Sequence, residues 1–332
     1  MKRDSRIDSL RALAIVLIIL AHVYPPTVLF QIRIFDVPLM AMLLGMSFIL
    51  SISKKNKEAY IDFVLKRFKR LVIPAWIFLT LFFICSFTAV NILNIESPYD
   101  LKTLISSYSL LSGIGYVWII RVFFTIAILS PLLFKVSKKI NTLLERCIAT
   151  FLLLFIQELL CILTEKLYGV NQYLFEQLVA ISFGYAIIAL VGMWAINQTR
   201  RENLISGCFF LTIFLATGKL QGFPLISDQK YPPTIYFLSF GLGISLFLFY
   251  LVSNKVLNPV LENETIVWVS KHSLEIYYWH IFPITMFELL LPDINWLMKF
   301  IITLIITGAI TILQTKYLPH FFNLRFINLK HD

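Results

Sequence analysis

The sequence predicts an all-α fold: a polytopic transmembrane helix bundle with about ten membrane-spanning helices and both termini in the cytoplasm. Three observations support this prediction. Hydrophobic residues make up 58% of the 332 residues, whereas charged residues make up only 14%. Apolar stretches of roughly 17 to 25 residues recur along the whole chain, and each is long enough to cross the hydrocarbon core as a helix. Basic residues are concentrated in alternate connections, as expected for loops on the cytoplasmic side.

The expected spans follow one another along the chain with short connections. In order, they cover residues 7–24, 35–52, 71–91, 117–135, 147–163, 174–196, 203–218, 234–252, 273–291 and 296–317. The seventh span is the weakest, because Gly218 and Lys219 leave it short. Without it, the C-terminus would lie on the other side of the membrane.

The distribution of Lys and Arg predicts the orientation. With a cytoplasmic N-terminus, the inner connections hold all but seven of the 29 basic residues, which is the asymmetry of the positive-inside rule. The seven are Arg33, Lys102, Arg121, Lys166, Lys219, Lys230 and Lys299. The net charge of +10 is therefore mainly an orientation signal. It does not indicate nucleic-acid binding.

Other classes of segment fit the chain less well. The first apolar stretch follows basic residues but continues into YPPTVLF without the small-residue cleavage site of a signal peptide. The four cysteines have no CxxC spacing and are expected to be small core residues rather than disulfide partners or metal ligands. With no internal repeat, linker or appended soluble domain in the pattern, residues 1–332 are expected to form a single membrane domain.

The first span contains two residues that a lipid-facing helix would not need. Arg11 and His22 are eleven residues apart, about three helical turns, so they share one face with roughly 16 Å of rise between them. Ionisable groups inside a span often mark a functional site. Alternatively, Arg11 reaches the near interface and His22 lies among lipid headgroups.

A basic cluster precedes the third span. Arg67 and Arg70 lie three residues apart on one helix face, flanked by Lys66 and Lys69. Guanidinium groups bind phosphates through paired, charge-assisted hydrogen bonds. On this stretch alone, the favoured interpretation is a cytoplasmic edge that binds anionic lipid headgroups. Pro74 is expected to loosen the helix near these side chains.

The ninth span carries the third polar motif, HSLEIYYWH. His280 lies near the middle of the span, with Glu275 and Glu288 in the same segment. Ionisable groups at this depth usually face the bundle interior. His272, at the interface, is expected to be structural.

Polar and aromatic residues of other spans have weaker signals. Glu158 in the fifth span is expected to form a hydrogen bond between helices. Trp118 and Arg121 lie at the outer end of the fourth span, and Tyr231 precedes the eighth. Such aromatic residues normally belong to the interfacial belt, although they also suit a cleft that accepts a sugar.

Together, these motifs resemble the acyltransferase-3 family of integral membrane acyltransferases, which includes O-acetyltransferases of bacterial surface polysaccharides. The matching features occur in the same order and cover nearly the whole chain. They are Arg11-x10-His22, Arg67-x-x-Arg70 ahead of Leu71 and Pro74, the Trp-Ile-Ile…Ser-Pro-Leu-Leu pattern of 118–133, and HSLEIYYWH.

The resemblance implies roles for individual residues. Arg11, His22, Arg67 and Arg70 match positions regarded as essential in the family, and His280 matches its later histidine. Two departures concern packing: Ala12 replaces the usual glycine, and PLMAMLLGMS replaces the Phe-rich Ser-Gly signature of the second span.

The resulting hypothesis is acyl transfer in the bacterial inner membrane, with acetyl-CoA as the cytoplasmic donor and a glycan or lipid-linked sugar as the acceptor. The expected catalytic residues are His22, Arg11 and His280, the expected donor-binding residues are Arg67, Arg70, Lys66 and Lys69, and the expected acceptor or cavity residues are Trp118, Arg121, Glu275 and Tyr231. His22 either removes the proton of the acceptor hydroxyl or forms an acyl-histidine intermediate. No bound cofactor or metal is expected.

Two other classes of function remain open. A transporter or flippase for a glycan or a small anionic solute also uses buried ionisable residues, although such carriers commonly show internal repeats and broken helices. A non-catalytic scaffold of an envelope assembly would not need the aligned Arg11 and His22.

Overall fold

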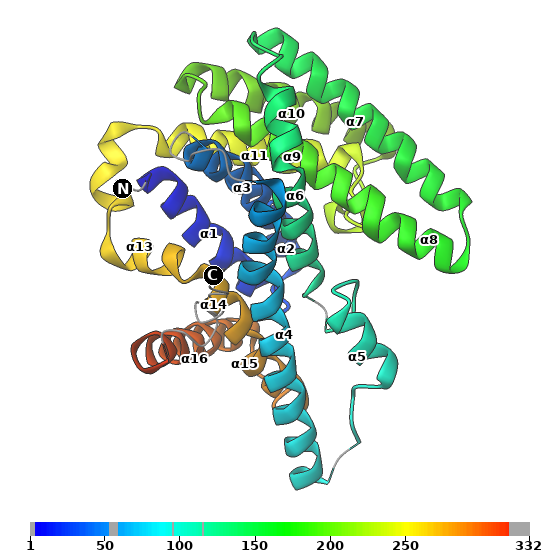
Figure 1. The fold of residues 1–332 in the computed structure, drawn as a ribbon, viewed down its shortest axis with the longest axis vertical. Helices are drawn as coiled ribbons and strands as arrows, with labels where there is room; N and C mark the ends of the chain where they lie inside the picture. Colours follow the sequence, from blue (N-terminus) through cyan, green and yellow to red (C-terminus); the bar gives the residue numbers. More distant parts are fainter. Residues whose placement is uncertain (1–3, 53–58, 95, 115, 319–332) are drawn as a thin grey trace, which may run out of the picture. The chain divides into compact units, whose positions relative to one another are not determined.

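A computed structural model describes residues 4–52, 59–94, 96–114 and 116–318. In these ranges the chain is helical and forms no named strand, with a single isolated bridge between Lys230 and Pro233 (Figure 1). This confirms the all-α prediction. The basic residues within 1–3, 53–58 and 319–332, which entered the orientation argument, lie outside the described residues. The cytoplasmic location of both termini stays a prediction.

Eight helical segments of the described chain are long and apolar enough to cross a membrane. They are Thr27–Ile52, Tyr60–Leu93, Trp118–Ser137, Leu143–Lys166, Gly169–Ala195, Arg200–Gln221, Ile235–Val252 and Trp296–Tyr317. The weakest expected span is thus a helix of 22 residues, α10 (Arg200–Gln221). Gly218 lies inside it against the rings of Phe223 and Tyr236, and the helix ends at Gly222, whose φ of 75° favours glycine.

The first and ninth expected spans are not among these eight segments. The first is α1 (Ser5–Ala21), a helix of 17 residues. The ninth is not one continuous helix, because it divides at His280 into α14 (Ser273–Trp279) and α15 (Ile281–Leu290). Pro283 accounts for the division: it has no N–H to offer the Trp279 carbonyl, and its ring crowds that carbonyl.

The chain forms two compact units, each of two chain segments. Unit 1 comprises Met1–Asn56 and Ile128–Ser273, and unit 2 comprises Lys57–Ala127 and Leu274–Asp332. Helix α6 (Trp118–Ser137) begins in unit 2 and ends in unit 1. The two units are described separately below.

Unit 1 is built around α3 (Asp36–Ile52), which packs against α1, α9 and α11. Helix α10 pairs with α11, and α13 packs on α1. The remaining helices and turns of this unit are α2 (Thr27–Ile32), α7 (Leu143–Lys166), α8 (Gly169–Phe175), the π-helical turn Glu176–Ala180, α9 (Ile181–Ala195), the 3-10 turns Ile226–Gln229 and Lys255–Leu257, α11 (Ile235–Val252), α12 (Asn258–Leu261) and α13 (Glu264–Lys271). The N-termini of α7 and α10 are fixed by capping boxes, Thr142 with Glu145 and Thr199 with Glu202.

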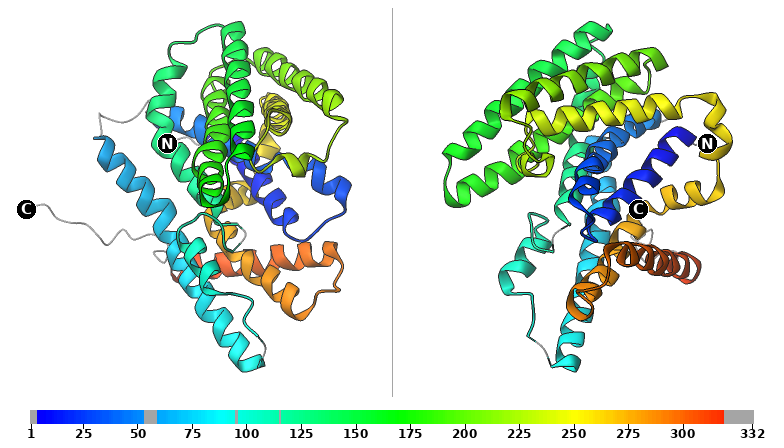
Figure 2. Two further views of the ribbon diagram at one scale, coloured as in Figure 1. Left: turned by 90° about the vertical axis from the view of Figure 1, so that its right-hand side faces the viewer. Right: turned by 180° about the vertical axis from the view of Figure 1, so that it is seen from behind.

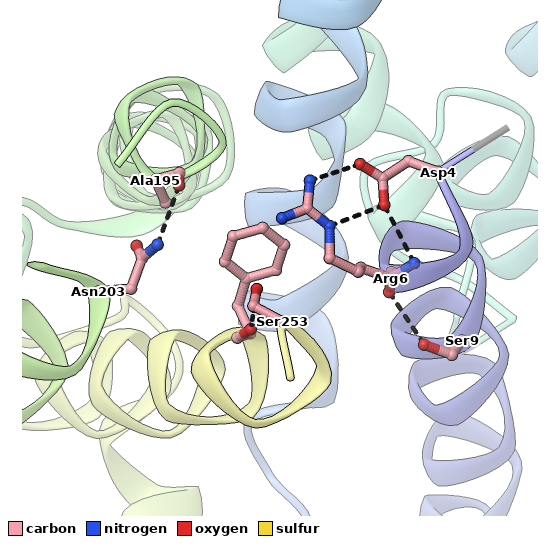
Figure 3. A network of polar contacts seen from close by, with 7 residues as sticks. Asp4, Arg6, Ser9, Ala195, Asn203 and Ser253 are labelled. Atoms are coloured by element: carbon pink, nitrogen blue, oxygen red, sulfur yellow. Dashed lines mark hydrogen bonds and ion pairs between the residues drawn. The ribbon is translucent and has the colours of Figure 1, made fainter. Parts of the chain in front are cut away.

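The start of α1 is fixed by Asp4 (Figure 3). Its carboxylate accepts hydrogen bonds from the backbone N–H of Arg6 at 3.0 Å and from Nη2 of Arg6 at 2.7 Å. Burial raises the pKa of Asp4, but the hydrogen bonds and charge of Arg6 outweigh this effect, so the pKa lies below its ordinary value. The Arg6 guanidinium also stacks over the ring of Phe249, 5.0 Å from its centroid, which ties α1 to α11.

The closest helix contact in unit 1 joins α3 and α9 through two glycines. A Cβ added at Gly45 would overlap the backbone carbonyl of Ala189, and one added at Gly192 would overlap the carbonyl of Met42. Small residues let helix backbones approach closely in membranes, where packing is a principal source of stability. The two glycines therefore set the spacing of α3 and α9.

Replacing Gly45 with alanine is expected to destabilise the protein by about 1–3 kcal/mol, because a backbone carbonyl has to move. Gly308→Ala is the matched control, since an added Cβ there meets nothing within 4 Å. The fraction of protein that stays monodisperse in detergent after heating measures the effect. Equal heat resistance of the two variants would contradict this interpretation.

Unit 2 contains α4 (Tyr60–Leu93), α5 (Leu101–Tyr108), α14, α15 and α16 (Trp296–Tyr317), with α15 and α16 packed as a hairpin (Figure 2). Helix α4 has 34 residues, or about 51 Å at 1.5 Å per residue, which exceeds the roughly 30 Å of hydrocarbon. It therefore extends beyond the membrane core. Trp76 of α4 donates to the Tyr108 carbonyl at 2.9 Å and so anchors α5.

Candidate active site

Polar side chains from three helices of unit 1 hold the Arg11 guanidinium. Its Nη2 donates to Ser47 Oγ of α3 at 2.9 Å, and its Nη1 donates to Ser270 Oγ of α13 at 3.4 Å. Asp8 Oδ1, one turn earlier on α1, lies 3.6 Å from Nη1 and accepts a hydrogen bond from Ser270 Oγ at 2.7 Å. An arginine that only reached the interface would need no such partners, so this contact set favours an inward role for Arg11.

Asp8 is a member of this network that the sequence interpretation missed. It is buried, with 3% of its surface exposed, and its position three residues before Arg11 is the signal that could have identified it, because side chains so spaced are neighbours on a helix. Ser47 and Ser270 had no comparable signal, since they are distant from Arg11 in sequence.

Asp8→Ala is expected to reduce the acyl-transfer activity predicted from the sequence about tenfold, the equivalent of one charge-assisted hydrogen bond. Without the carboxylate, Ser270 and Arg11 lose the group that fixes their orientation. Ser9→Ala is a matched control, because Ser9 Oγ donates only to the carbonyl of Arg6 among the contacts described for it. Wild-type activity of Asp8→Ala in membranes with equal protein content would refute this role.

His22 caps the C-terminus of α1 and is half-buried. Its backbone N–H donates to the Ile19 carbonyl at 3.1 Å. The helix is continuous from Arg11 to Ala21, so the expected rise of about 16 Å between Arg11 and His22 applies. The predicted placement of Arg11 and His22 on one helix face therefore rests on a continuous α1.

The four residues of the basic cluster, Lys66, Arg67, Lys69 and Arg70, lie in the first turns of α4. Arg70 and Lys66 are exposed, whereas Arg67 and Lys69 are half-buried. The Arg67 guanidinium lies over the ring of Phe63, 5.1 Å from its centroid. This stacking orders the guanidinium group.

Tyr278 of α14 connects the HSLEIYYWH motif to this basic end of α4. Its hydroxyl donates to the Leu71 carbonyl at 3.2 Å, and its ring stacks on Phe78 with centroids 5.2 Å apart. Pro74 has no N–H for the Arg70 carbonyl, yet α4 stays helical through it. The loosening expected at Pro74 does not interrupt the helix, and Tyr278 supports α4 at this point.

His280 lies fully buried at the junction of α14 and α15. Its Nδ1 contacts the backbone carbonyl of Tyr277. Because a carbonyl only accepts, Nδ1 carries the proton, and Nε2 is the nitrogen with basic character. The Tyr277 hydroxyl donates to the Tyr116 carbonyl, and Trp279 Nε1 donates to Gln314 Oε1 at 2.8 Å. These contacts hold the motif within unit 2.

The four expected acceptor or cavity residues have different environments. Trp118 and Arg121 are buried, with 8% and 7% of their surfaces exposed. Nη1 of Arg121 donates to the Leu111 carbonyl at 3.2 Å, which holds the loop before α6. Glu275 is half-buried in unit 2, whereas Tyr231 belongs to unit 1 and is 48% exposed. Tyr231 is thus the only one of the four that is largely open to the surroundings.

The expectation for Glu158 is met within unit 1. Glu158 of α7 accepts a hydrogen bond from the N–H of Ile235 at 2.9 Å, which joins α7 to the start of α11 as expected. The four cysteines are free thiols, but only Cys147 and Cys161 are buried. Cys85 of α4 and Cys208 of α10 are exposed, so the expectation of core residues is wrong for these two. The described residues include no cluster of His, Cys, Asp and Glu suited to a metal ion.

Comparison with known proteins identifies the family. The sequence model of the acyltransferase-3 family, which is described as an acyltransferase domain, matches residues 4–315 of the chain. No curated protein and no solved structure gives a match to the chain. The matched range contains every residue of the candidate site. The chain therefore belongs to the acyltransferase-3 family of multi-pass membrane acyltransferases.

Proposed function

We propose that this acyltransferase transfers an acetyl group from cytoplasmic acetyl-CoA to a hydroxyl of a cell-surface or lipid-linked glycan, at the bacterial inner membrane. The observation that carries the proposal is the set of contacts around Arg11. A guanidinium held by Asp8, Ser47 and Ser270 inside unit 1, on the helix that ends at His22, suits a long anionic ligand lying along α1.

The donor-binding residues follow from charge and geometry. The phosphates of acetyl-CoA are anionic, and Arg67 and Arg70, with Lys66 and Lys69 beside them, supply a cationic surface at the start of α4. Arginine suits phosphate because its planar group donates two parallel hydrogen bonds. The stacking of Arg67 on Phe63 reduces the entropy lost when a phosphate binds.

The acceptor is activated by a histidine. His22 removes the proton of the acceptor hydroxyl, because an imidazole is the side chain best suited to accept a proton at neutral pH. The hydroxyl oxygen attacks the thioester carbon, the C–S bond breaks, and the proton passes from His22 to the CoA thiolate. The alternative is an acyl-histidine intermediate with two successive transfers. His280, with its proton on Nδ1, is the second candidate base.

Comparison of the surface glycan of cells with and without the gene tests the proposal. NMR is expected to show loss of an ester-linked acetyl signal from an otherwise intact glycan. Loss of the entire glycan would instead support a carrier, and an unchanged acetyl signal would refute O-acetylation of that glycan. Complementation with the wild-type chain and with His22→Ala separates catalysis from mere presence of the protein.

A further inference from the structure

Unit 1 contains a buried arginine, Arg33, that the proposed mechanism does not use. Arg33 follows α2 and has 3% of its surface exposed, and Asp36, the first residue of α3, has 1% exposed. Arg33 Nη1 and Asp36 Oδ2 form an ion pair of 2.5 Å. A charged pair this deeply buried is expensive to desolvate, so its position in the fold is informative.

The ion pair lies at the His22 end of the α1–α3 pair. Helices α1 and α3 pack against each other, and the connection between them runs from His22 at the C-terminus of α1 to Asp36 at the N-terminus of α3. The connection of residues 23–35 contains α2 and turns the chain back, so the two packed helices run antiparallel. The end of α1 and the start of α3 therefore lie at the same level.

The Arg33 guanidinium is fixed on two sides and has one unused donor. Asp36 holds Nη1, and the ring of Phe30 covers one face of the guanidinium at 4.1 Å. The Nε–H of Arg33 is buried and has no hydrogen-bond acceptor within the described residues. Buried N–H groups nearly always have an acceptor, so an ordered, desolvated Nε–H at the His22 end of α1 is suited to a ligand oxygen.

We propose that Arg33 is a further catalytic residue, whose Nε–H donates to the thioester carbonyl oxygen of the acyl donor during transfer. The inference rests on the proposed function, since it requires the acyl group to reach His22. As the acceptor hydroxyl oxygen bonds to the carbonyl carbon, the C=O electron pair moves to oxygen and His22 takes the proton. Arg33 stabilises the resulting oxyanion, which collapses as the C–S bond breaks and His22 protonates the leaving thiolate.

Asp36 is a positioning residue in this scheme. Its Oδ1 accepts the Val37 N–H at 2.7 Å, so the carboxylate is fixed to the backbone while Oδ2 orients Arg33. A preorganised donor stabilises a developing charge without having to reorient during the reaction. A purely structural ion pair would only hold the connection between α1 and α3, and the test has to separate these two roles.

Acetyl transfer in inverted membrane vesicles, from radiolabelled acetyl-CoA to the native membrane glycan, provides the test. The variants are Arg33→Lys, which keeps the pair with Asp36, and the neutral double variant Arg33→Gln with Asp36→Asn. Gln31→Ala is the control, because Gln31 binds Ser227 at 2.9 and 3.1 Å and so anchors the same connection without contributing a cation. His22→Ala is tested in parallel.

The discriminating measurement compares acetyl-CoA with its dithioester analogue, in which sulfur replaces the carbonyl oxygen. An N–H donor stabilises an oxyanion better than a thiolate, so the wild type is expected to prefer acetyl-CoA. Both Arg33 variants should lower kcat, by about 100-fold in the double variant, and should shrink that preference while donor binding stays at its wild-type level. Gln31→Ala should keep the preference.

The outcomes separate the inference from the proposed function. Wild-type kcat in the Arg33 variants, or a lower kcat with an undiminished oxygen preference, would overturn the catalytic role of Arg33. Absence of acetyl transfer by the wild-type chain would overturn the proposed function, whereas full activity of His22→Ala would overturn only the role of His22 as the base and, with it, the step assigned to Arg33. If the double variant does not accumulate, Arg33→Lys carries the test, since it retains the charge on which the local fold depends.

Discussion

His22→Ala is expected to abolish acetyl transfer while acetyl-CoA still binds. Loss of a general base typically costs about 10²- to 10⁴-fold in rate. Donor affinity should persist, because the phosphates are expected to contact α4 rather than the end of α1. Transfer of radiolabelled acetyl groups and calorimetric binding of acetyl-CoA, both on the full chain in detergent or membranes, measure the two effects separately.

His272→Ala is the matched control for this variant. His272 is also half-buried and at a helix C-terminus, where its ring packs 5.1 Å from that of Trp268, but it has no assigned part in the chemistry. Its substitution should leave kcat near the wild-type value. If His22→Ala retained full acetylation, the assignment of His22 as the base would be wrong.

Arg67→Ala and Arg70→Ala are expected to weaken acetyl-CoA binding by about tenfold to about 100-fold each. The range corresponds to roughly 1.5–3 kcal/mol for hydrogen bonds to a charged group. Arg67→Lys should fall between wild type and Arg67→Ala, since it keeps the charge but loses the paired donors. The dissociation constant should also rise with salt concentration, which screens exposed charges.

Arg200→Ala controls for the loss of a stacked arginine at an exposed helix start. Arg200 lies over the ring of Tyr250, 4.2 Å from its centroid, much as Arg67 lies over Phe63. A general electrostatic effect on an anionic donor would lower affinity in both variants alike. A specific site at α4 requires that only the Arg67 and Arg70 variants lose affinity.

Much of the fold was predictable from hydrophobic length, because a chain in lipid has to satisfy its backbone hydrogen bonds within each helix. The interruption at His280 was harder to predict. Pro283 and Pro74 are both prolines in apolar stretches, yet the helix divides near the first and continues through the second. The difference depends on tertiary support, such as the Tyr278 hydroxyl bound to the Leu71 carbonyl.

The candidate site was predictable only where its members are close in sequence or match a family motif. The alignment of Arg11 with His22 follows from helical periodicity. The side chains that hold Arg11 come from α3 and α13, and no spacing rule relates them to α1. Arg33 and Asp36 are also three residues apart, but the sequence placed Arg33 near an outer loop, and the burial of the pair becomes evident only in the folded chain.

The glycine contact between α3 and α9 also determines where the polar groups lie along the membrane normal. Sliding α3 past α9 by one residue would place a leucine or methionine side chain where Gly45 meets the Ala189 carbonyl. The pair therefore has one permitted register. Since α3 carries both Ser47 and Asp36, that register fixes the depth of the partners of Arg11 and Arg33 together, so the two guanidinium groups keep a constant separation in depth.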